Sequence, residues 1–417
     1  MEATKDIQGR LTWTFIVSFL ATFFGGIISM LMSVYLPVAV KDLIGDVTEN
    51  KMNDVGAWIN SVFIFGWMFG GVLWGIVCDK IGRAKSVALS IACAGLFAVI
   101  TGLSSSWMLV SICRFFSGFG IGGILVTTTM IVSELWTGKM KAVVLGIVAV
   151  AMPVGFFAAG AINNITGDWR AAFWTGLAPL AMAAIAYFTL PESAKWKSDK
   201  LLGKKAQAKS ELFAAEHRKN LFFGSIIFGA MLIGLWAIFS WAPTWVQSIS
   251  TSDNVQQQRG DTMMILAAGG IAGSFVSGWV VNAIGMRKTM LMCFAVCFLM
   301  AFVVFRLNKD VTVITLIEMA VLVFFFGISQ GALAVYIPAL FPVSIGGSAT
   351  GFCFNVGRLF TGTVVFFIGS LVTVLGGYGN AIFIFSFIFV VGFIATWLSP
   401  DIKISQEKSV PEAALPA

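Results

Sequence analysis

The feature that most constrains the fold of this chain is a series of twelve apolar segments, each long enough to cross a bilayer. A helix of about 20 residues spans the hydrocarbon and satisfies its own backbone hydrogen bonds, so each segment is predicted to be a transmembrane helix. The chain is therefore predicted to be an all-α membrane protein. The segments cover residues 11–40, 56–78, 84–104, 107–136, 140–165, 170–190, 220–248, 262–284, 287–307, 311–340, 346–375 and 379–398.

The composition excludes several classes of protein. Of 417 residues, 58% are hydrophobic and 11% are charged, whereas a soluble domain carries roughly 25% charged residues. The net charge of +7 comes from Lys and Arg between apolar segments, where they orient helices, so nucleic acid is not an expected partner. The six cysteines lack metal-ligand spacing, and no metal, disulfide framework or cofactor is expected. Clustered catalytic residues are absent from the sequence, which argues against a membrane enzyme.

The polar segments set the domain organisation and the orientation. The one long polar segment, Glu192 to Asn220, lies between the sixth and seventh apolar segments. We expect a six-helix bundle over 1–191, a cytoplasmic linker over 192–219, a second six-helix bundle over 220–400 and a cytoplasmic tail over 401–417. Lys and Arg are concentrated in this linker and in the loops on the same side, which predicts that both termini are cytoplasmic. The expected location is the cell (inner) membrane.

A charged turn between the second and third segments is the most distinctive motif. Gly71 and Gly75 precede Asp79-Lys80, and Gly82-Arg83 follow after one residue. A weaker copy recurs about two hundred residues later, where Gly278 is followed by Asn282, Gly285, Arg287 and Lys288. Two related turns, one in each half of the chain, indicate an internal duplication.

These motifs resemble those of a known family. The pattern G-x-x-x-D-[RK]-x-G-[RK] resembles the loop between helices 2 and 3 of the major facilitator superfamily. The run from Arg114 through Gly118, Gly120, Gly122 and Gly123 resembles helix 4 of its sugar and organic-acid porters. The runs 336–342 and 351–358 resemble the helix 10 to helix 11 region of its sialate/lactate and related metabolite symporters. The resemblance implies two pseudo-symmetric six-helix bundles that rock around a midplane substrate site.

The resemblance also implies a set of gating residues. In this family the loop acid and its basic neighbours tie helix 2 to helices 4 and 11 on the cytoplasmic side and hold the outward-open state. Simple orienting charges would account for the basic residues but not for the acid beside them. Because Asn282 replaces the acid in the second half, the first-half contact is expected to dominate. The matching positions here are Asp79, Lys80, Gly82, Arg83, Glu134 and Arg287.

Arg114 is the strongest substrate-binding candidate in the sequence. It lies inside an apolar segment, where an unpaired charge costs several kcal/mol and is functional by default. The first apolar segment contains no acid, and Ile124-Leu125 stand where relatives of the sialate group carry a carboxylate. An anionic substrate is therefore a predicted partner. The alternative, that Arg114 bonds backbone carbonyls or a distant acid, is equally compatible with the sequence.

Other candidates come from helices that line the central cavity in the family. Asn355 and Arg358 are three residues apart and therefore share one helical face, which could meet the cavity or lock the helix to its neighbours. Glu318 is a candidate proton site, because burial favours the neutral form of a carboxyl group, with packing in the outer leaflet as the alternative. The remaining substrate-site candidates, each of which could instead pack or anchor its helix, are Trp236, Trp241, Gln330 and Tyr336.

The predicted function is secondary active transport of a small organic anion, with proton coupling. A monocarboxylate such as lactate or pyruvate, or a related acid, is preferred to a neutral sugar, because Arg114 lacks an acidic partner in the sequence and because of the resemblance to the sialate/lactate symporters. The alternatives are a sugar or sugar-acid:proton symporter of the same superfamily and a sensor built on a transporter fold. The expected partners are the small-molecule substrate, protons and the lipid bilayer, and the chain is expected to be a monomer.

Overall fold

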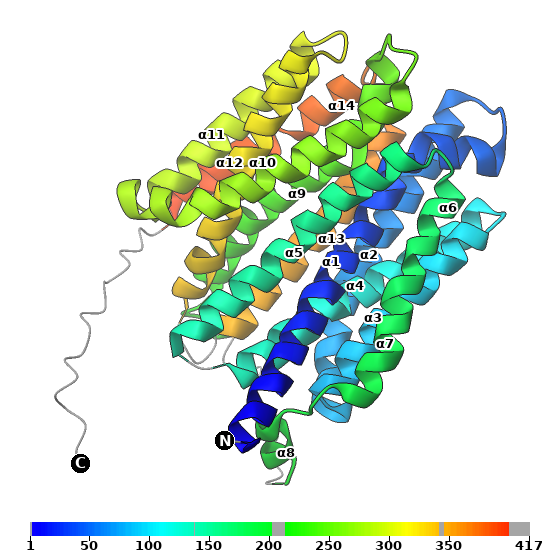
Figure 1. Ribbon diagram of the computed structural model, residues 1–417. Helices are drawn as coiled ribbons and strands as arrows, with labels where there is room; N and C mark the ends of the chain where they lie inside the picture. Colours follow the sequence, from blue (N-terminus) through cyan, green and yellow to red (C-terminus); the bar gives the residue numbers. More distant parts are fainter. Residues whose placement is uncertain (1, 137, 202–212, 342–345, 400–417) are drawn as a thin grey trace.

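The computed structural model describes residues 2–136, 138–201, 213–341 and 346–399, which form helices joined by short turns (Figure 1). Twelve helical spans are long and apolar enough to cross a membrane, as the sequence predicts. Most of the predicted linker and the whole predicted tail lie outside the described residues. The helices are α1 (Glu2–Ile44), α2 (Glu49–Ile81), α3 (Arg83–Leu103), α4 (Trp107–Leu135), α5 (Gly138–Ile165), α6 (Trp169–Phe173), α7 (Leu177–Thr189), α8 (Ala194–Leu201), α9 (Arg218–Ile249), α10 (Val255–Ile284), α11 (Met286–Phe302), α12 (Val313–Ala339), α13 (Gly346–Ser370), α14 (Tyr378–Phe385) and α15 (Ile388–Leu398).

Two of the spans are broken into pairs of helices. The sixth consists of α6, the 3₁₀ turn η1 (Trp174–Gly176) and α7, and the twelfth consists of α14 and α15. Pro179 lies in the first turn of α7, where its missing N–H costs no hydrogen bond. Between α14 and α15, the hydroxyl of Ser386 donates to the Phe383 carbonyl. The ninth span ends in a π-helical turn, η3 (Val303–Leu307).

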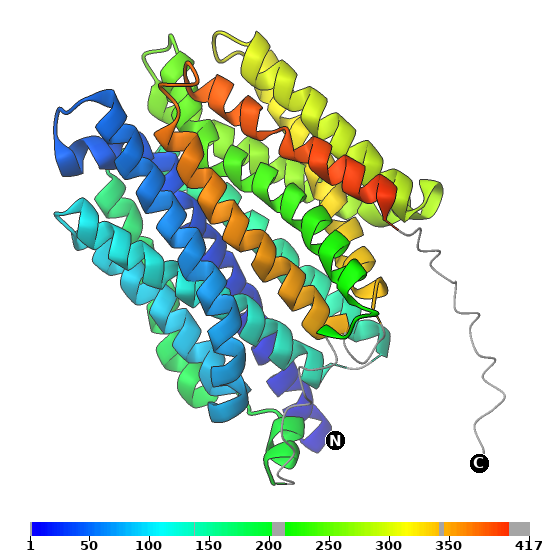
Figure 2. The ribbon, with the colours of Figure 1, turned by 180° about the vertical axis from the view of Figure 1, so that it is seen from behind.

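The helices pack as two bundles, and equivalent helices of the two bundles meet at the interface. α1 to α7 form the first bundle and α9 to α15 form the second, and α2 contacts α13 while α5 contacts α10 (Figures 1 and 2). These are the second and fifth spans of each bundle, so the two contacts are related by the internal duplication. One end of the molecule carries the start of α1 and α8 and is called the linker side (Figure 1). The opposite end, with the loops at 45–48 and 371–377, is called the distal side.

The turn between the second and third spans has the same backbone conformation in both bundles. Gly82 and Gly285 both have positive φ, +109° and +84° respectively, and each ends one helix and begins the next. A side chain would be strained at either position. The two charged motifs in the sequence therefore correspond to structurally equivalent turns.

Glycines bring α2 and α4 into unusually close contact. A Cβ atom at Gly118 would lie 2.1 Å from the carbonyl oxygen of Phe63, and one at Gly122 would lie 2.3 Å from that of Trp67. Small residues allow backbones to approach in this way within membranes. Glycines of α2 make the reciprocal approach to α4, namely Gly66 and Gly70. The glycine run of α4 is thus a helix-packing surface, and it holds Phe63 and Trp67 against α4.

Candidate substrate site and gating contacts

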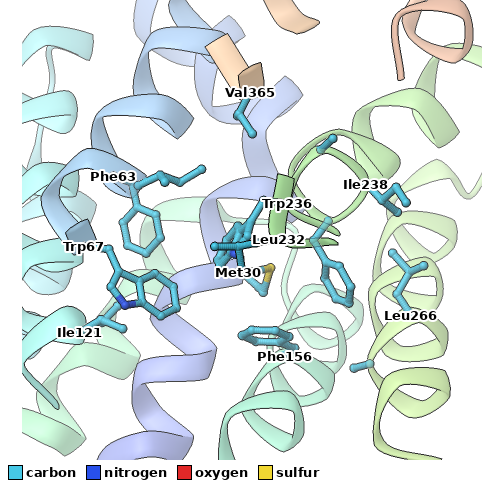
Figure 3. Close-up of a cluster of buried hydrophobic side chains, with 14 of the residues drawn as sticks. Met30, Phe63, Trp67, Ile121, Phe156, Leu232, Trp236, Ile238, Leu266 and Val365 are labelled. Carbon is cyan, nitrogen blue, oxygen red and sulfur yellow. The ribbon is translucent and has the colours of Figure 1, made fainter. Parts of the chain in front are cut away.

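Three aromatic side chains meet at the interface of the two bundles. Phe63 and Trp67 come from α2 and Trp236 comes from α9, and we call them the aromatic cluster (Figure 3). The ring centroids of Trp67 and Trp236 are 5.2 Å apart in an edge-to-face arrangement, and those of Phe63 and Trp67 are 5.9 Å apart. All three side chains are buried. Phe63 and Trp67 follow the same face of α2 because they are four residues apart.

Arg114 of α4 lies against this cluster and is 1% exposed. Its guanidinium donates hydrogen bonds to the carbonyl oxygens of Ile28 at 2.8 Å and Ser29 at 3.3 Å, both on α1. The guanidinium carbon is 3.9 Å from the ring centre of Phe63, within cation–π range. The Nε atom is buried without a partner among the described residues. Arg114 thus adopts the backbone-bonded arrangement that the sequence left open as an alternative, and no carboxylate of the described residues pairs with it.

Arg358 of α13 also lies against the cluster, at Trp67. Its guanidinium carbon is 5.3 Å from the ring centre of Trp67. Unlike Arg114, it makes no hydrogen bond or ion pair with any residue that the structure describes. Asn355, one turn earlier, faces Gly71 of α2, where a Cβ would lie 3.0 Å from the amide oxygen. The shared face predicted for Asn355 and Arg358 therefore points at α2 across the bundle interface.

Trp241 and Tyr336, two other predicted residues, make their contacts away from the aromatic cluster. Trp241 donates its indole N–H to the Val365 carbonyl at 3.1 Å and lines a cavity of about 250 Å³ at the distal end of the interface. Tyr336 shares a hydrogen bond with Ser399 at 2.7 Å, which joins α12 to the end of α15 inside the second bundle. Gln330 has a buried amide nitrogen without a partner in the described part of the chain. That Gln330 lines the substrate site stays a prediction, and the contacts of Trp241 and Tyr336 give each of them a packing role.

Glu318 also lies outside the cluster. Its carboxylate accepts a hydrogen bond of 2.6 Å from the side chain of Asn308, which in turn donates to the Val303 and Val304 carbonyls at the start of η3. Glu318 therefore holds the distal turn between α11 and α12 within the second bundle. This matches the packing alternative, and its contacts give the proton-coupling prediction no support.

The charged turn forms a compact cluster on the linker side, which we call the Arg83 cluster (Asp79, Arg83, Glu134 and Glu192). The Arg83 guanidinium pairs with Glu134 and with Asp79, each at 3.0 Å. The Glu192 carboxylate accepts from the backbone N–H groups of Arg83 at 2.7 Å and Ala84 at 3.3 Å. Such a carboxylate satisfies free N–H groups at the start of a helix, here α3. The positive φ of Gly82 favours glycine, and a Cβ there would displace the Glu192 carboxylate, whose oxygen would lie 2.1 Å away.

Two of the predicted gating contacts are not made in this conformation. The Arg83 cluster ties α2 to α4, as expected, but among the described residues it makes no bond to α13, the predicted helix 11. Arg287 donates to the Trp397 carbonyl at the end of α15. Both residues belong to the second bundle, so this bond does not connect the two bundles. Lys80 is exposed. Glu192 was predicted only as the start of the linker, because a sequence does not reveal which distant backbone an acid will reach.

Comparison with known proteins identifies the family. The family model of the Major Facilitator Superfamily matches residues 14–361. The chain belongs to this superfamily. It is 27% identical over 369 residues to a cis,cis-muconate transport protein of Acinetobacter baylyi, covering 84% of this chain and 86% of the relative. It is 24% identical over 307 residues to a sialic acid transporter of Escherichia coli, covering 72% and 73%.

Solved structures show the same fold. The xylose transporter of Escherichia coli, in an inward open conformation, superposes with a TM-score of 0.78 at 16% identity, covering 95% of this chain and 98% of that chain. A D-xylose-proton symporter superposes with a TM-score of 0.72 at 17% identity, covering 92% and 95%. The chain is thus a membrane transporter of the major facilitator fold and not an enzyme.

The distal side of this transporter is held closed by hydrogen bonds between the bundles. Asn163 donates its amide to the Gln256 carbonyl at 2.6 Å, and Gln256 donates to the Asn163 carbonyl at 2.7 Å. Asn164 bonds Asp261 at 2.7 Å. Two further bonds join Asn50 to Thr373 and Asn53 to Tyr378. All of these bonds lie in the distal half, so this conformation is closed at that end.

Neutralising the acids of the Arg83 cluster is expected to lower transport unequally. The side chains of Arg83 and Glu134 are 11% and 10% exposed, whereas that of Asp79 is 51% exposed. Breaking a buried pair costs about 3 kcal/mol, while an exposed pair contributes at most about 1 kcal/mol. Glu134→Gln should therefore lower both the unfolding temperature and uptake more than Asp79→Asn. Equal effects of the two substitutions would contradict this ranking.

Proposed function

We propose that this transporter carries a small organic anion by alternating access, with the aromatic cluster, Arg114 and Arg358 at the substrate site. The observation that carries the proposal is the pair of guanidiniums that contact the aromatic cluster, neither of which pairs with a carboxylate of the described residues. A charge inside a membrane is costly unless it is compensated, and a substrate carboxylate supplies the compensation. Within this class of substrates, the sequence favours a monocarboxylate such as lactate or pyruvate.

Arg358 is the better first contact for the carboxylate. A guanidinium presents a planar fork that binds both oxygens of a carboxylate, whereas an ammonium offers a point charge. Arg114 already uses two of its donors on α1 carbonyls, and Arg358 uses none on described residues. The sequence predicts Arg114 as the main carboxylate-binding residue. The hydrogen bonds of Arg114 to α1 favour a carboxylate-binding role shared with Arg358.

The similar proteins support an acid rather than a sugar. Two of the relatives are a muconate transporter and a sialic acid transporter, and both substrates are acids. The structural neighbours that carry xylose share only 16–17% identity and bear on the fold alone. A neutral sugar would leave both guanidiniums uncompensated. Transport of a sugar is the second candidate to be tested.

The orientation in the membrane is also proposed. The linker side carries the Arg83 cluster and the positively charged turns, so we place it in the cytoplasm of the inner membrane together with both termini. The bundles over 1–191 and 220–400 would then rock against each other, opening the site to each side in turn. Proton coupling stays a prediction, and the hydrogen bond of Glu318 to Asn308 gives that residue a packing role instead.

Uptake into proteoliposomes tests the proposal. The parent protein is expected to accumulate labelled pyruvate, benzoate or adipate, but not labelled xylose. Arg114→Lys should lower uptake by at least about tenfold, because it removes the two-hydrogen-bond fork while keeping the charge. Arg306→Lys, at an exposed distal residue that bonds Asn380, is the matched control and should transport like the parent. Undiminished uptake by Arg114→Lys, or uptake of xylose alone by the parent, would reject the proposal.

A further inference from the structure

Two guanidiniums lie around one aromatic cluster in the middle of the molecule. The contacts run in sequence from Arg114 to Phe63 at 3.9 Å, from Phe63 to Trp67 at 5.9 Å, and from Trp67 to Arg358 at 5.3 Å. Arg114 belongs to the first bundle and Arg358 to the second. The aromatic cluster thus separates two positive charges that approach the same place from opposite bundles.

No acid among the described membrane-spanning residues neutralises these charges. Glu134 is paired with Arg83 on the linker side, and Glu318 is bonded to Asn308 near the distal side. Another buried arginine, Arg259, lies in the distal part of α10 and bonds Gln247. Two like charges in a low-dielectric interior repel each other, and each also carries its own cost of burial.

The two guanidiniums also retain donors for a ligand. Arg114 donates to the carbonyls of Ile28 and Ser29, and its Nε–H is buried without an acceptor among the described residues. Arg358 is held by its ring contact with Trp67, and its N–H groups bond none of the described residues. A single carboxylate at Arg358 would leave the charge and the free donor of Arg114 unmatched. A second anionic group would match both.

We propose that the cargo is a dianion, a small organic acid with two carboxylates, one bound by Arg358 and the other by Arg114. Its carbon chain would lie along the rings of Phe63 and Trp67, whose apolar faces accept hydrocarbon between the two charges. This inference rests on the proposed organic-anion function, and within that class it favours acids with two carboxylates over the monocarboxylates that the sequence favours. In this arrangement each bundle contributes one arginine, so neither bundle alone forms the complete site.

A matched pair of ligands tests the second charge directly. Linear diacids from succinate to adipate are compared with their monomethyl esters, which keep the length and remove one charge. Binding to the purified full-length protein is measured by calorimetry and by the rise in unfolding temperature, at pH 7, where free carboxyl groups are ionised. The best-binding diacid is expected to bind at least about tenfold more tightly than its ester, the size expected for one added charge-assisted contact.

Variants assign the two carboxylates. Arg358→Gln and Arg114→Gln should each bring the diacid-to-ester ratio close to one, because a single arginine remains. Arg306→Gln, which removes a charge from an exposed distal residue, should keep the ratio of the parent. If a glutamine variant does not fold, the lysine variant replaces it and should lower the ratio in part, since the charge remains and the fork is lost.

The outcomes separate this inference from the function on which it rests. Equal binding of diacids and monoesters by the parent would overturn the dianion and leave the organic-anion proposal intact. A ratio that stays at the parental value in both glutamine variants would overturn the assignment to the two arginines. If the protein binds xylose but binds no acid of the series and neither pyruvate nor benzoate, both proposals are rejected.

Discussion

Gly122→Leu is expected to destabilise the folded protein by about 3 kcal/mol or more and to abolish transport, the range seen when a side chain is forced into a packed interior. Even a Cβ atom at this position would lie 2.3 Å from the Trp67 carbonyl oxygen and 2.6 Å from the Gly71 nitrogen. These are backbone atoms, so relief requires the whole of α2 to move away from α4. That movement would carry Trp67 away from Arg358 and would open the aromatic cluster.

The unfolding temperature in detergent and uptake in proteoliposomes measure this effect. Gly146→Leu is the matched control, because Gly146 is an exposed helical glycine of α5, and no atom lies within 4 Å of the place that a Cβ would occupy there. The same substitution at this position should be neutral or slightly stabilising, since glycine is a poor helix former. A Gly122→Leu protein that unfolds and transports like Gly146→Leu would show that the close contact of α2 with α4 is dispensable.

Much of the fold could be predicted from local sequence alone. Hydrophobicity over about 20 residues locates a membrane span without knowledge of its neighbours, and all twelve spans appear. The turn at Gly82 was equally accessible, because its charges, glycine and spacing lie within a few residues. The breaks at Gly176 and Ser386 were missed, since an apolar run does not reveal where its helix bends.

The partners of the candidate residues were harder to predict. Arg114 was identified because a charge in an apolar segment is conspicuous, but its bonds to Ile28 and Ser29 depend on how α1 packs against α4. Phe63 and Trp67 were missed because the chain contains 39 Phe and 14 Trp, and nothing local marks the ones at the bundle interface. Their only signal was indirect, in the glycines of α4 that lie opposite them.

The distal contacts were missed for a similar reason. Amide side chains such as Asn163 and Gln256 near the ends of apolar segments are typical of solvated loops, and each acquires a partner only when the bundles meet. These contacts are also specific to one conformation, because alternating access requires the same surfaces to separate. A sequence specifies both conformations at once and therefore does not indicate which contacts belong to which.

Cross-linking the distal side is expected to stop transport almost completely. Asn50 and Thr373 are exposed, lie in different bundles and are hydrogen bonded to each other. In the double variant Asn50→Cys/Thr373→Cys, a disulfide would hold the two bundles together at this end. Substrate could then exchange only with the linker side. Uptake should fall by at least about tenfold on cross-linking and recover on reduction, since alternating access needs both sides to open.

A cross-link of the same kind within one bundle is the control. Thr251 donates its hydroxyl to Asp310 at 2.8 Å, and both residues lie in distal loops of the second bundle. The variant Thr251→Cys/Asp310→Cys should therefore transport equally well before and after cross-linking, because its bundle moves as a unit. The six native cysteines are buried or half-buried, so the introduced thiols should react first. If the cross-linked Asn50→Cys/Thr373→Cys protein transports at the rate of its reduced form, the bundles do not separate at the distal side during transport.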